Sequence, residues 1–137
     1  MKKLLSVLLI CVILVIGCTS IAMANEIMPL YNEIAAITCG IYPGTRSIEY
    51  DVYVYVPSSD TLDSAYIDLE LRTTSGKVIA TYTSKKMTKG GIYFTYEGAT
   101  PVTTNGTYFY TYEIRCYKNG LMVDNPTGTS RNLSYTP

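Results

Sequence analysis

The sequence predicts an all-β protein in which two antiparallel sheets pack as a sandwich of seven or eight strands. Three observations favour this fold class. The 137-residue chain contains 14 Tyr and no Trp or His, and Tyr, like Thr, favours the half-buried surface of a pleated sheet. Apolar and polar residues alternate over several short runs, which is the period of a strand with one buried face. Turn residues separate these runs, and no helical period is found beyond the N-terminal segment.

The first 24 residues are predicted to be an export signal with a helical apolar part. Lys2 and Lys3 provide a basic start, residues 4–17 form an apolar run, and Ala22-Met23-Ala24 is a small-x-small cleavage site. The run is too short to span a bilayer comfortably, so a signal that is removed is favoured over a retained anchor. The protein is therefore expected to be secreted.

Cleavage after Ala24 would leave 113 of the 137 residues, a length that suits one domain with a single core. Residues 25–33 are expected to form a loose N-terminal arm, and residues 34–137 the sandwich. Removal of the two signal lysines changes the net charge from 0 to −2. That balance does not favour binding to nucleic acid.

A second interpretation of the N-terminus places a lipid on Cys18. Val15-Ile16-Gly17-Cys18 resembles a bacterial lipobox, in which the cysteine is acylated and becomes the first mature residue. Two acyl chains on Cys18 would hold the domain at a membrane, because stable anchoring takes more than one chain. The protein would then be a cell-surface lipoprotein with residues 19–33 as its tether. Without lipidation, no membrane contact is expected.

Eight alternating runs are expected to form the strands. They cover residues 34–41, 47–56, 65–73, 78–84, 92–96, 107–117, 121–123 and 130–135. The clearest is 47–56, in which Ile48, Val52 and Val54 alternate with polar or aromatic residues and are predicted to face the core. The other residues expected to point inward are Ala35, Ile37, Cys39, Ile41, Tyr50, Val56, Ile67, Leu69, Leu71, Ile92, Phe94, Tyr96, Tyr108, Tyr110, Tyr112, Ile114 and Cys116.

Turn residues indicate where the chain is expected to reverse. Pro43-Gly44 is predicted to be the turn after the first strand, and Ser75-Gly76 to join two strands as a hairpin. Asn119-Gly120 is the strongest hairpin signal, because both residues tolerate the positive φ of a type I′ turn. Residues 85–91 and 101–106 are expected to be loops.

Cys39 and Cys116 are the only cysteines left after cleavage, and both are expected on the inner face of a strand. In an exported protein such a pair is most simply a disulfide between the two sheets. Two free buried thiols and pairing between chains are the alternatives. No metal or other cofactor is expected, because two Cys without His do not make a usual zinc shell.

At the level of architecture, the domain resembles the immunoglobulin and fibronectin type III sandwiches. The resemblance rests on the strand count, the Cys39/Cys116 pair and Gly106-Thr107-Tyr108 at the start of the late strand. The chain differs in having no Trp to pack on the cysteines, and Tyr108 or Tyr112 is the candidate for the tyrosine corner of that group. The export signal and the Tyr- and Thr-rich sandwich also resemble short exported proteins of Gram-positive bacteria, which implies localisation but no activity.

No catalytic site is expected. A serine or cysteine triad needs a base, usually His, and the chain has none. Glu49 and Asp51 share one strand face at a spacing of about 7 Å, and Asp68 and Glu70 share another. Carboxylates in this pattern are typical of a solvated strand surface, and Asp68, Glu70 and Arg72 could pair across with Glu113 and Arg115 if their strands are neighbours. The protein is therefore not expected to be an enzyme.

Outward aromatic residues are the candidates for ligand binding. They are Tyr53, Tyr55, Tyr66, Phe109 and Tyr117. Tyr offers a large apolar ring with a polar tip, which suits recognition of sugars or proteins; the alternative is that these residues only fill the outer surface of their strands. We expect an exported non-catalytic binding or interaction module whose partner is a protein or a glycan. The alternative is a cell-surface lipoprotein or structural component tethered through Cys18, or a subunit that associates through a sheet edge.

Overall fold

The structure, a computed structural model, describes residues 32–137. The chain divides into two units, Met1–Leu30 and Tyr31–Pro137, and the second contains every described residue. The predicted export signal over residues 1–24, the lipidation alternative at Cys18 and most of the predicted arm therefore lie outside the described part. Within the described part, no helix is long and apolar enough to cross a membrane.

Strands provide the regular structure of residues 32–137. In chain order they are β1 (Ala36–Gly44), β2 (Ser47–Tyr55), β3 (Ser64–Thr73), β4 (Val78–Lys86), β5 (Thr88–Lys89), β6 (Tyr93–Pro101), β7 (Gly106–Lys118), β8 (Leu121–Asp124), β9 (Thr127–Thr129) and β10 (Leu133–Tyr135). The number exceeds the predicted seven or eight because the short strands β5 and β9 fall in segments between the predicted strands.

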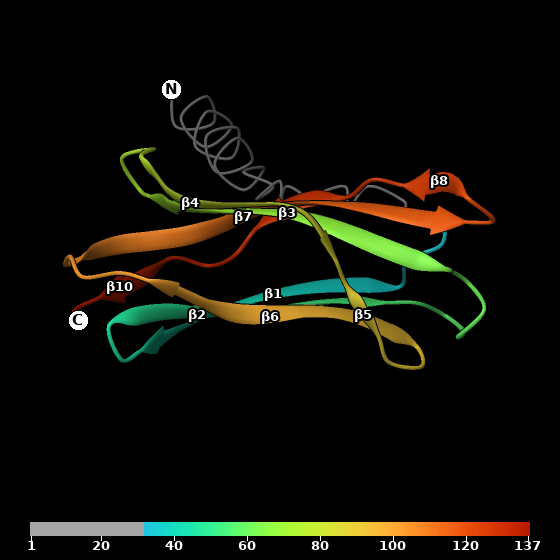
Figure 1. Cartoon of the computed structure of the whole chain (residues 1–137), viewed down its shortest axis with the longest axis horizontal. Coiled ribbons are helices and arrows are strands. Elements are labelled where there is room, and N and C mark those ends of the chain that lie inside the picture. The colour runs from blue at the N-terminus through green and yellow to red at the C-terminus, as the bar shows by residue number, and fades with distance from the viewer. Residues whose placement is uncertain (1–31) are drawn as a thin grey trace, which may run out of the picture. The chain divides into compact units, whose positions relative to one another are not determined.

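The strands form two antiparallel sheets that face each other, so the predicted all-β sandwich is confirmed (Figure 1). Sheet A has the strand order β1-β2-β6-β5. Sheet B follows the path β10-β7-β3-β4, and β8 and β9 also pair with β7. In Figure 1 the chain leaves β4 in the upper sheet and crosses to β5 in the lower one, so the connection between these strands joins the two layers.

The core lies between the sheets and is built from the alternating positions of the longer strands. Its large, fully buried side chains are Tyr108, Tyr110, Phe94, Ile41, Ile48, Leu62, Ile67, Leu69, Leu71, Ile114, Val52 and Val54. All of these except Leu62 belong to the inner faces predicted from the sequence. Burying each Val, Leu, Ile or Phe contributes roughly 1.5–3 kcal/mol, so this shared layer is what holds the two sheets together.

Tyrosine hydroxyls join the two sheets inside this core. Thr100 Oγ1 on β6 lies 2.7 Å from the Tyr110 hydroxyl on β7 and 2.8 Å from the Tyr82 hydroxyl on β4. The Tyr110 hydroxyl also donates to the carbonyl oxygen of Ile48 on β2, at 3.3 Å. The ring of Tyr50 packs edge-on against Tyr110 with centroids 5.0 Å apart, and burial raises the pKa of both phenols. Because the hydroxyls of Tyr82 and Tyr110 have partners, burying these rings leaves no orphaned polar group.

Tyr108 fixes the loop that precedes β7. Its hydroxyl donates to the carbonyl oxygen of Thr104 at 2.9 Å and lies 2.8 Å from Thr104 Oγ1. A hydroxyl that returns to the backbone a few residues upstream is the geometry of a tyrosine corner. Of the two candidates predicted for this role, Tyr108 has the geometry.

Two predicted hairpins are confirmed. β3 and β4 pair through the turn that contains Gly76, whose φ is 89°. β7 and β8 pair through Asn119 and Gly120, whose φ values are 51° and 77°. Positive φ at both central residues is what a type I′ turn requires and matches the twist of the flanking strands.

The predicted turn at Pro43-Gly44 is wrong. β1 continues through both residues, and Thr45 and Arg46 make the turn, with Arg46 at a φ of 54°. Pro43 is accommodated within the strand because β1 lies at the edge of sheet A, where a proline nitrogen can face away from the neighbouring strand. Proline in the sequence therefore marked an edge position rather than a turn.

The prediction of a loop over residues 85–91 is wrong in part. β4 extends to Lys86, and Thr88–Lys89 forms β5 on the edge of sheet A. Ile92 was expected to point inward but is 55% exposed, because it precedes β6. Ala35, at the start of the first predicted strand, is likewise exposed and lies before β1.

Cys39 and Cys116 are both free thiols, so the predicted disulfide between the sheets is not formed in this structure. Cys116 is fully buried, whereas Cys39 is half-buried on the edge strand β1. Burial raises the pKa of each thiol to about 12, with Asp51 adding to the effect at Cys39 and Asp124 at Cys116. The sequence predicted the inner face for both residues, but bonding also requires a specific distance and orientation between two strands, which alternation does not determine.

Candidate functional site

The five aromatic residues predicted to bind a ligand lie at three separate places. Tyr53 and Tyr55 are on the outer face of sheet A, on β2. Tyr66 on β3 and Tyr117 on β7 meet on the outer face of sheet B, with ring centroids 5.8 Å apart and planes at 90°. Phe109 is also on β7, eight residues before Tyr117 and toward the other end of the strand. A single site therefore cannot contain all five.

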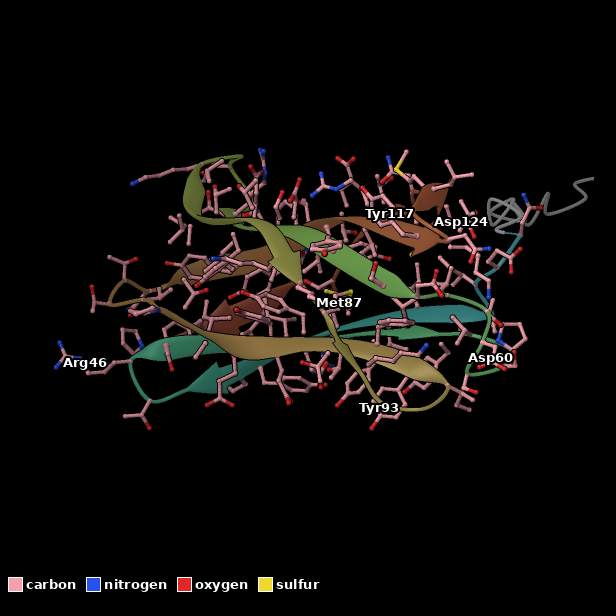
Figure 2. The ribbon with its side chains drawn as sticks, turned by 45° about the vertical axis from the view of Figure 1, so that its right-hand side comes forward. Arg46, Asp60, Met87, Tyr93, Tyr117 and Asp124 are labelled. Carbon is pink, nitrogen blue, oxygen red and sulfur yellow. The ribbon has the colours of Figure 1, made fainter. Side chains whose placement is uncertain are left out.

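Tyr93 joins Tyr53 and Tyr55, and we call these three residues the tyrosine cluster. The rings of Tyr53 and Tyr55 stack with centroids 6.0 Å apart and an interplanar angle of 18°. The ring of Tyr93 lies 5.8 Å from that of Tyr53 and 6.3 Å from that of Tyr55, tilted against both. Figure 2 shows Tyr93 on the side of sheet A that faces away from sheet B. All three side chains are half-buried, so part of each remains accessible to a partner.

Strand register assembles the tyrosine cluster. Tyr55 on β2 is the direct partner of Tyr93 on β6, and Tyr53 is the partner of Thr95. Gly90 donates its N–H to the carbonyl oxygen of Tyr93 at 2.8 Å, and a Cβ on Gly90 would lie 2.6 Å from the Tyr93 ring. The Thr95 hydroxyl oxygen is buried and has no hydrogen-bond partner among the described residues. The tyrosine cluster therefore lies beside a buried hydroxyl, that of Thr95, which makes no hydrogen bond within the described residues.

The outer face of sheet A is acidic beside the tyrosine cluster. Asp51 on β2 and Glu97 on β6 are direct partners, and Glu49 is the next outward residue along β2. We call Glu49, Asp51 and Glu97 the acidic row. The ion pairs found within residues 32–137 involve other carboxylates. Like charges directly opposite each other destabilise a sheet, so the Asp51–Glu97 pair lowers stability in the isolated chain.

Tyr42 on β1 extends this face toward the sheet edge. Its side chain is 41% exposed, and its hydroxyl donates to both carboxylate oxygens of Asp51, at 3.1 and 3.3 Å. The N–H of Gly40 donates to Asp51 Oδ1 at 3.1 Å. A Cβ on Gly40 would overlap Asp51 and Tyr42, so glycine at this position makes room for the hydrogen bond. The nearby carboxylate raises the pKa of the Tyr42 phenol, first through this hydrogen bond and then through its charge.

The outer face of sheet B also has two carboxylates directly opposite each other, Asp68 on β3 and Glu113 on β7, but here arginines pair with carboxylates. Arg115 on β7 binds Asp68 on β3 through two hydrogen bonds of 3.0 Å, which is one of the cross-strand pairings considered from the sequence. Arg72 binds Glu70 on the same strand through Nε at 2.9 Å. Pairs of this kind on a partly exposed surface contribute modestly to stability. Of the two, the Asp68–Arg115 pair joins different strands and so also supports their register.

An open groove of about 340 Å³ also lies on the outer face of sheet B. It is lined by Asp68, Glu70, Thr81, Thr83, Thr111, Tyr112, Glu113 and Thr127. The backbone N–H of Ser84, and then Arg115, lower the pKa of Asp68, and Glu113 accepts a hydrogen bond from Asn125 at 3.1 Å. A carboxyl that acts as a general acid needs a raised pKa, which is the opposite of what surrounds Asp68.

Five residues of the outer face of sheet A were not among the predicted binding residues: Tyr42, Glu49, Asp51, Tyr93 and Glu97. For Tyr93 a signal was present, because alternation around the inward Phe94 places its neighbour outward. The sequence did not indicate that β6 pairs with β2 rather than with another strand. That pairing brings Tyr93 to Tyr55 and Glu97 to Asp51.

Within residues 32–137 no group of three or more His, Cys, Asp or Glu side chains could hold a metal ion. No protein-family model matches the chain, and no curated protein matches it. Among solved structures, it is similar to a protein of Bacteroides fragilis assigned as a beta-galactosidase, at 13% identity and a TM-score of 0.41. The match covers 68% of this chain but only 15% of that protein, and neither a family nor an activity follows from it.

Proposed function

We propose that the protein is an exported, non-catalytic interaction module that binds its partner through the outer face of sheet A. The partner that suits this face is a protein segment carrying Lys or Arg side chains. Localisation outside the cytoplasm rests on the export signal predicted for residues 1–24. The fold suits the role, since sandwiches of the immunoglobulin and fibronectin type III kind, which the chain resembles in its tyrosine corner, present sheet faces and loops to partners.

One observation carries this proposal: the outer face of sheet A retains features that reduce the stability of the isolated chain. Among the described residues, Asp51 faces Glu97 without a paired cation, and the Thr95 hydroxyl is buried without a partner. Proteins violate such local rules mainly where function requires it. A partner with cationic side chains would neutralise the acidic row, and its Lys or Arg groups would be attracted to the faces of the tyrosine rings.

The groove on sheet B supports the non-catalytic part of the proposal. Each carboxylate in the groove accepts a hydrogen bond from a neighbouring side chain. Asp68 accepts from Arg115, Glu70 from Arg72 and Glu113 from Asn125. The lowered pKa of Asp68 keeps that group ionised at neutral pH, so it does not supply a proton. An enzyme acting here would need a second residue that does.

Binding of a labelled lysine- and arginine-rich peptide to the chain that begins at Asn25 tests the proposal. Replacing Tyr53 and Tyr55 with Ser should weaken binding at least tenfold, because the stacked rings are lost from the contact surface. The matched control replaces Tyr66 and Tyr117 with Ser on sheet B, where binding should not change. Circular dichroism of both variants checks that each retains its strands.

Salt and charge supply the second arm of the test. Affinity should fall as ionic strength rises, since a partly exposed acidic surface is screened within about 8–10 Å. Replacing Glu97 with Gln should weaken the peptide complex, whereas replacing Glu113 with Gln on sheet B should not. Equal loss from both double-tyrosine variants, or salt-independent binding, would place the contact elsewhere. An array of neutral glycans that binds where the basic peptide does not would reassign the partner to carbohydrate.

A further inference from the structure

The two sheets have four edges, and three of them are blocked against pairing with another strand. Strand β5, at one edge of sheet A, has only two residues. Strand β4, at one edge of sheet B, pairs with two register shifts and carries Ser84 at a φ of 51° followed by Lys85 and Lys86. Bulges and lysines of this kind are how sheets prevent edge-to-edge association.

The other edge of sheet B is broken into separate pieces. Strands β8, β9 and β10 pair with successive parts of β7 and have four, three and three residues. Short segments separated by loops do not offer a continuous row of backbone groups. No long strand of a partner could therefore be added beside β7.

Strand β1 differs from the other three edges. Its nine residues contain no charged side chain and pair with β2 in one uninterrupted register. Pro43 has no N–H and tolerates a strand position only where its nitrogen faces away from the neighbouring strand. Because orientation alternates along an antiparallel pair, Ile37, Cys39 and Ile41 also direct their N–H and C=O groups outward. None of these three N–H groups has a further backbone partner within residues 32–137.

The core is incompletely closed at the same edge. Ile37 and Cys39 point inward from β1 and pack against the core, yet both remain partly exposed. Their partners Val54 and Val52 on β2 are fully buried. A strand added beside β1 would cover these apolar side chains as well as pair the free backbone groups.

We propose that β1 pairs antiparallel with β1 of a second copy of this chain, about a two-fold axis at Cys39. In that register Ile37 lies opposite Ile41 of the partner copy, and Thr38 lies opposite Gly40 of the partner copy. The uncharged sequence of β1 suits this arrangement, because a residue near the two-fold axis lies close to its own copy in the partner, and a charged residue there would be repelled. Pro43 lies outside the central paired residues, so its missing N–H removes no hydrogen bond from the centre of the paired strands.

The dimer joins two four-stranded sheets into one of eight strands. The two outer faces of sheet A then form one continuous surface, with their β2 strands three strand spacings, about 14 Å, apart. That separation exceeds the screening length of physiological salt, so the acidic rows do not prevent association. A partner with repeated basic segments would meet two sites at once, which raises its apparent affinity. The dimer itself rests on the edge of β1 and not on the proposed binding face.

Sedimentation equilibrium of the chain that begins at Asn25, combined with amide hydrogen exchange, tests the dimer. We expect a monomer–dimer equilibrium in which the amides of Ile37, Cys39 and Ile41 become protected as the dimer forms. Replacing Thr38 with Glu should weaken dimerisation at least tenfold, because the introduced carboxylate would lie near Asp51 and close to the two-fold axis. The matched control replaces Thr88 with Glu on β5, the other edge of the same sheet, and should leave the dimer unchanged.

Three results would overturn the proposal. The first is a chain that stays monomeric up to a concentration of about 1 mM, which would leave any self-association with a Kd weaker than that value. The second is a dimer that survives in the Thr38→Glu variant while circular dichroism shows that the variant is folded. The third is protection of the three outward amides in the monomer, which would mean that another segment of the same chain covers the edge. Loss of peptide binding with an intact dimer would reject only the proposed function.

Discussion

The outer faces of the two sheets are built from the same kinds of residue and are organised in opposite ways. On sheet B, Asp68 and Glu70 each have an arginine partner, and Tyr66 packs edge-on against Tyr117. On sheet A, three carboxylates and three clustered tyrosines occur without an arginine or lysine among the outward residues of β1, β2 and β6.

The difference teaches which surface is optimised for folding and which is not. Sheet B also sets two carboxylates directly opposite each other, Asp68 and Glu113, but there the Arg115 ion pair and the Ser84 N–H bound to Asp68 offset the repulsion. On sheet A the Asp51–Glu97 pair and the unpaired Thr95 hydroxyl work against the fold. The following predictions test this contrast, from the largest expected effect to the smallest.

The reactivity of the two thiols compares the inner sides of the two sheets, since Cys39 lies on β1 of sheet A and Cys116 on β7 of sheet B. Because the pKa of each thiol is raised to about 12 by burial, its thiolate fraction at pH 8 is about 1000-fold below that of a free cysteine. Native protein should therefore react very slowly with iodoacetamide, and half-buried Cys39 faster than buried Cys116. Both should react promptly after unfolding, as counted by mass spectrometry. If no thiol reacted in the unfolded chain without reductant, the cysteines would be oxidised.

Replacing Asp68 with Ala should destabilise the protein by about 1–2 kcal/mol. The change removes two hydrogen bonds from Arg115 and one from the Ser84 backbone, and hydrogen bonds to charged groups are the stronger class, discounted here for partial exposure. Urea unfolding measures the effect. Glu49→Ala on sheet A is the matched control and should change stability little; an equal loss from both variants would remove the contrast between the faces.

The same carboxylate should make stability depend on pH in the acid range. Since the pKa of Asp68 is lower in the folded chain, its contribution is present above the unfolded value of about 3.9 and is lost as pH falls through the folded value. The Asp68→Asn variant should lose less stability than wild type between about pH 4 and pH 2. Unfolding curves at several pH values measure this, and parallel losses in the two proteins would contradict it.

Replacing Thr95 with Val should stabilise the protein by about 1 kcal/mol. The hydroxyl is buried without a partner among the described residues, and exchanging an unsatisfied polar group for an apolar group of the same shape removes its desolvation cost. Thermal unfolding measures the change. Thr100→Val is the control with the opposite sign, because the Thr100 hydroxyl lies within hydrogen-bond distance of Tyr82 and Tyr110.

The smallest effect is expected from Glu97→Gln, which should stabilise the protein by about 0.5 kcal/mol. The variant removes one of two like charges that lie directly opposite each other on β6 and β2. The gain should shrink at high salt, since screening weakens repulsion between exposed charges. A salt-independent gain would point to packing rather than charge as its cause.

Alternation in the sequence was sufficient to predict much of this protein. It predicted the all-β class and the inner faces of β2, β3 and β7, and the turn residues predicted the hairpin at Asn119-Gly120, because each depends on neighbours a few residues apart. Outward placement of Tyr53 and Tyr55 followed from the same rule. Local signals failed where a residue had two structural uses, as at Pro43, which suits both a turn and a sheet edge.

Only the tertiary structure decided which outward residues meet. Pairing of β2 with β6 created the tyrosine cluster and set Asp51 against Glu97, while pairing of β3 with β7 gave Asp68 its arginine. The same long-range pairings left β1 at an open edge and kept the two thiols unbonded. Strand order and register are set by the summed packing of both sheets, and no short segment of the chain contains that information.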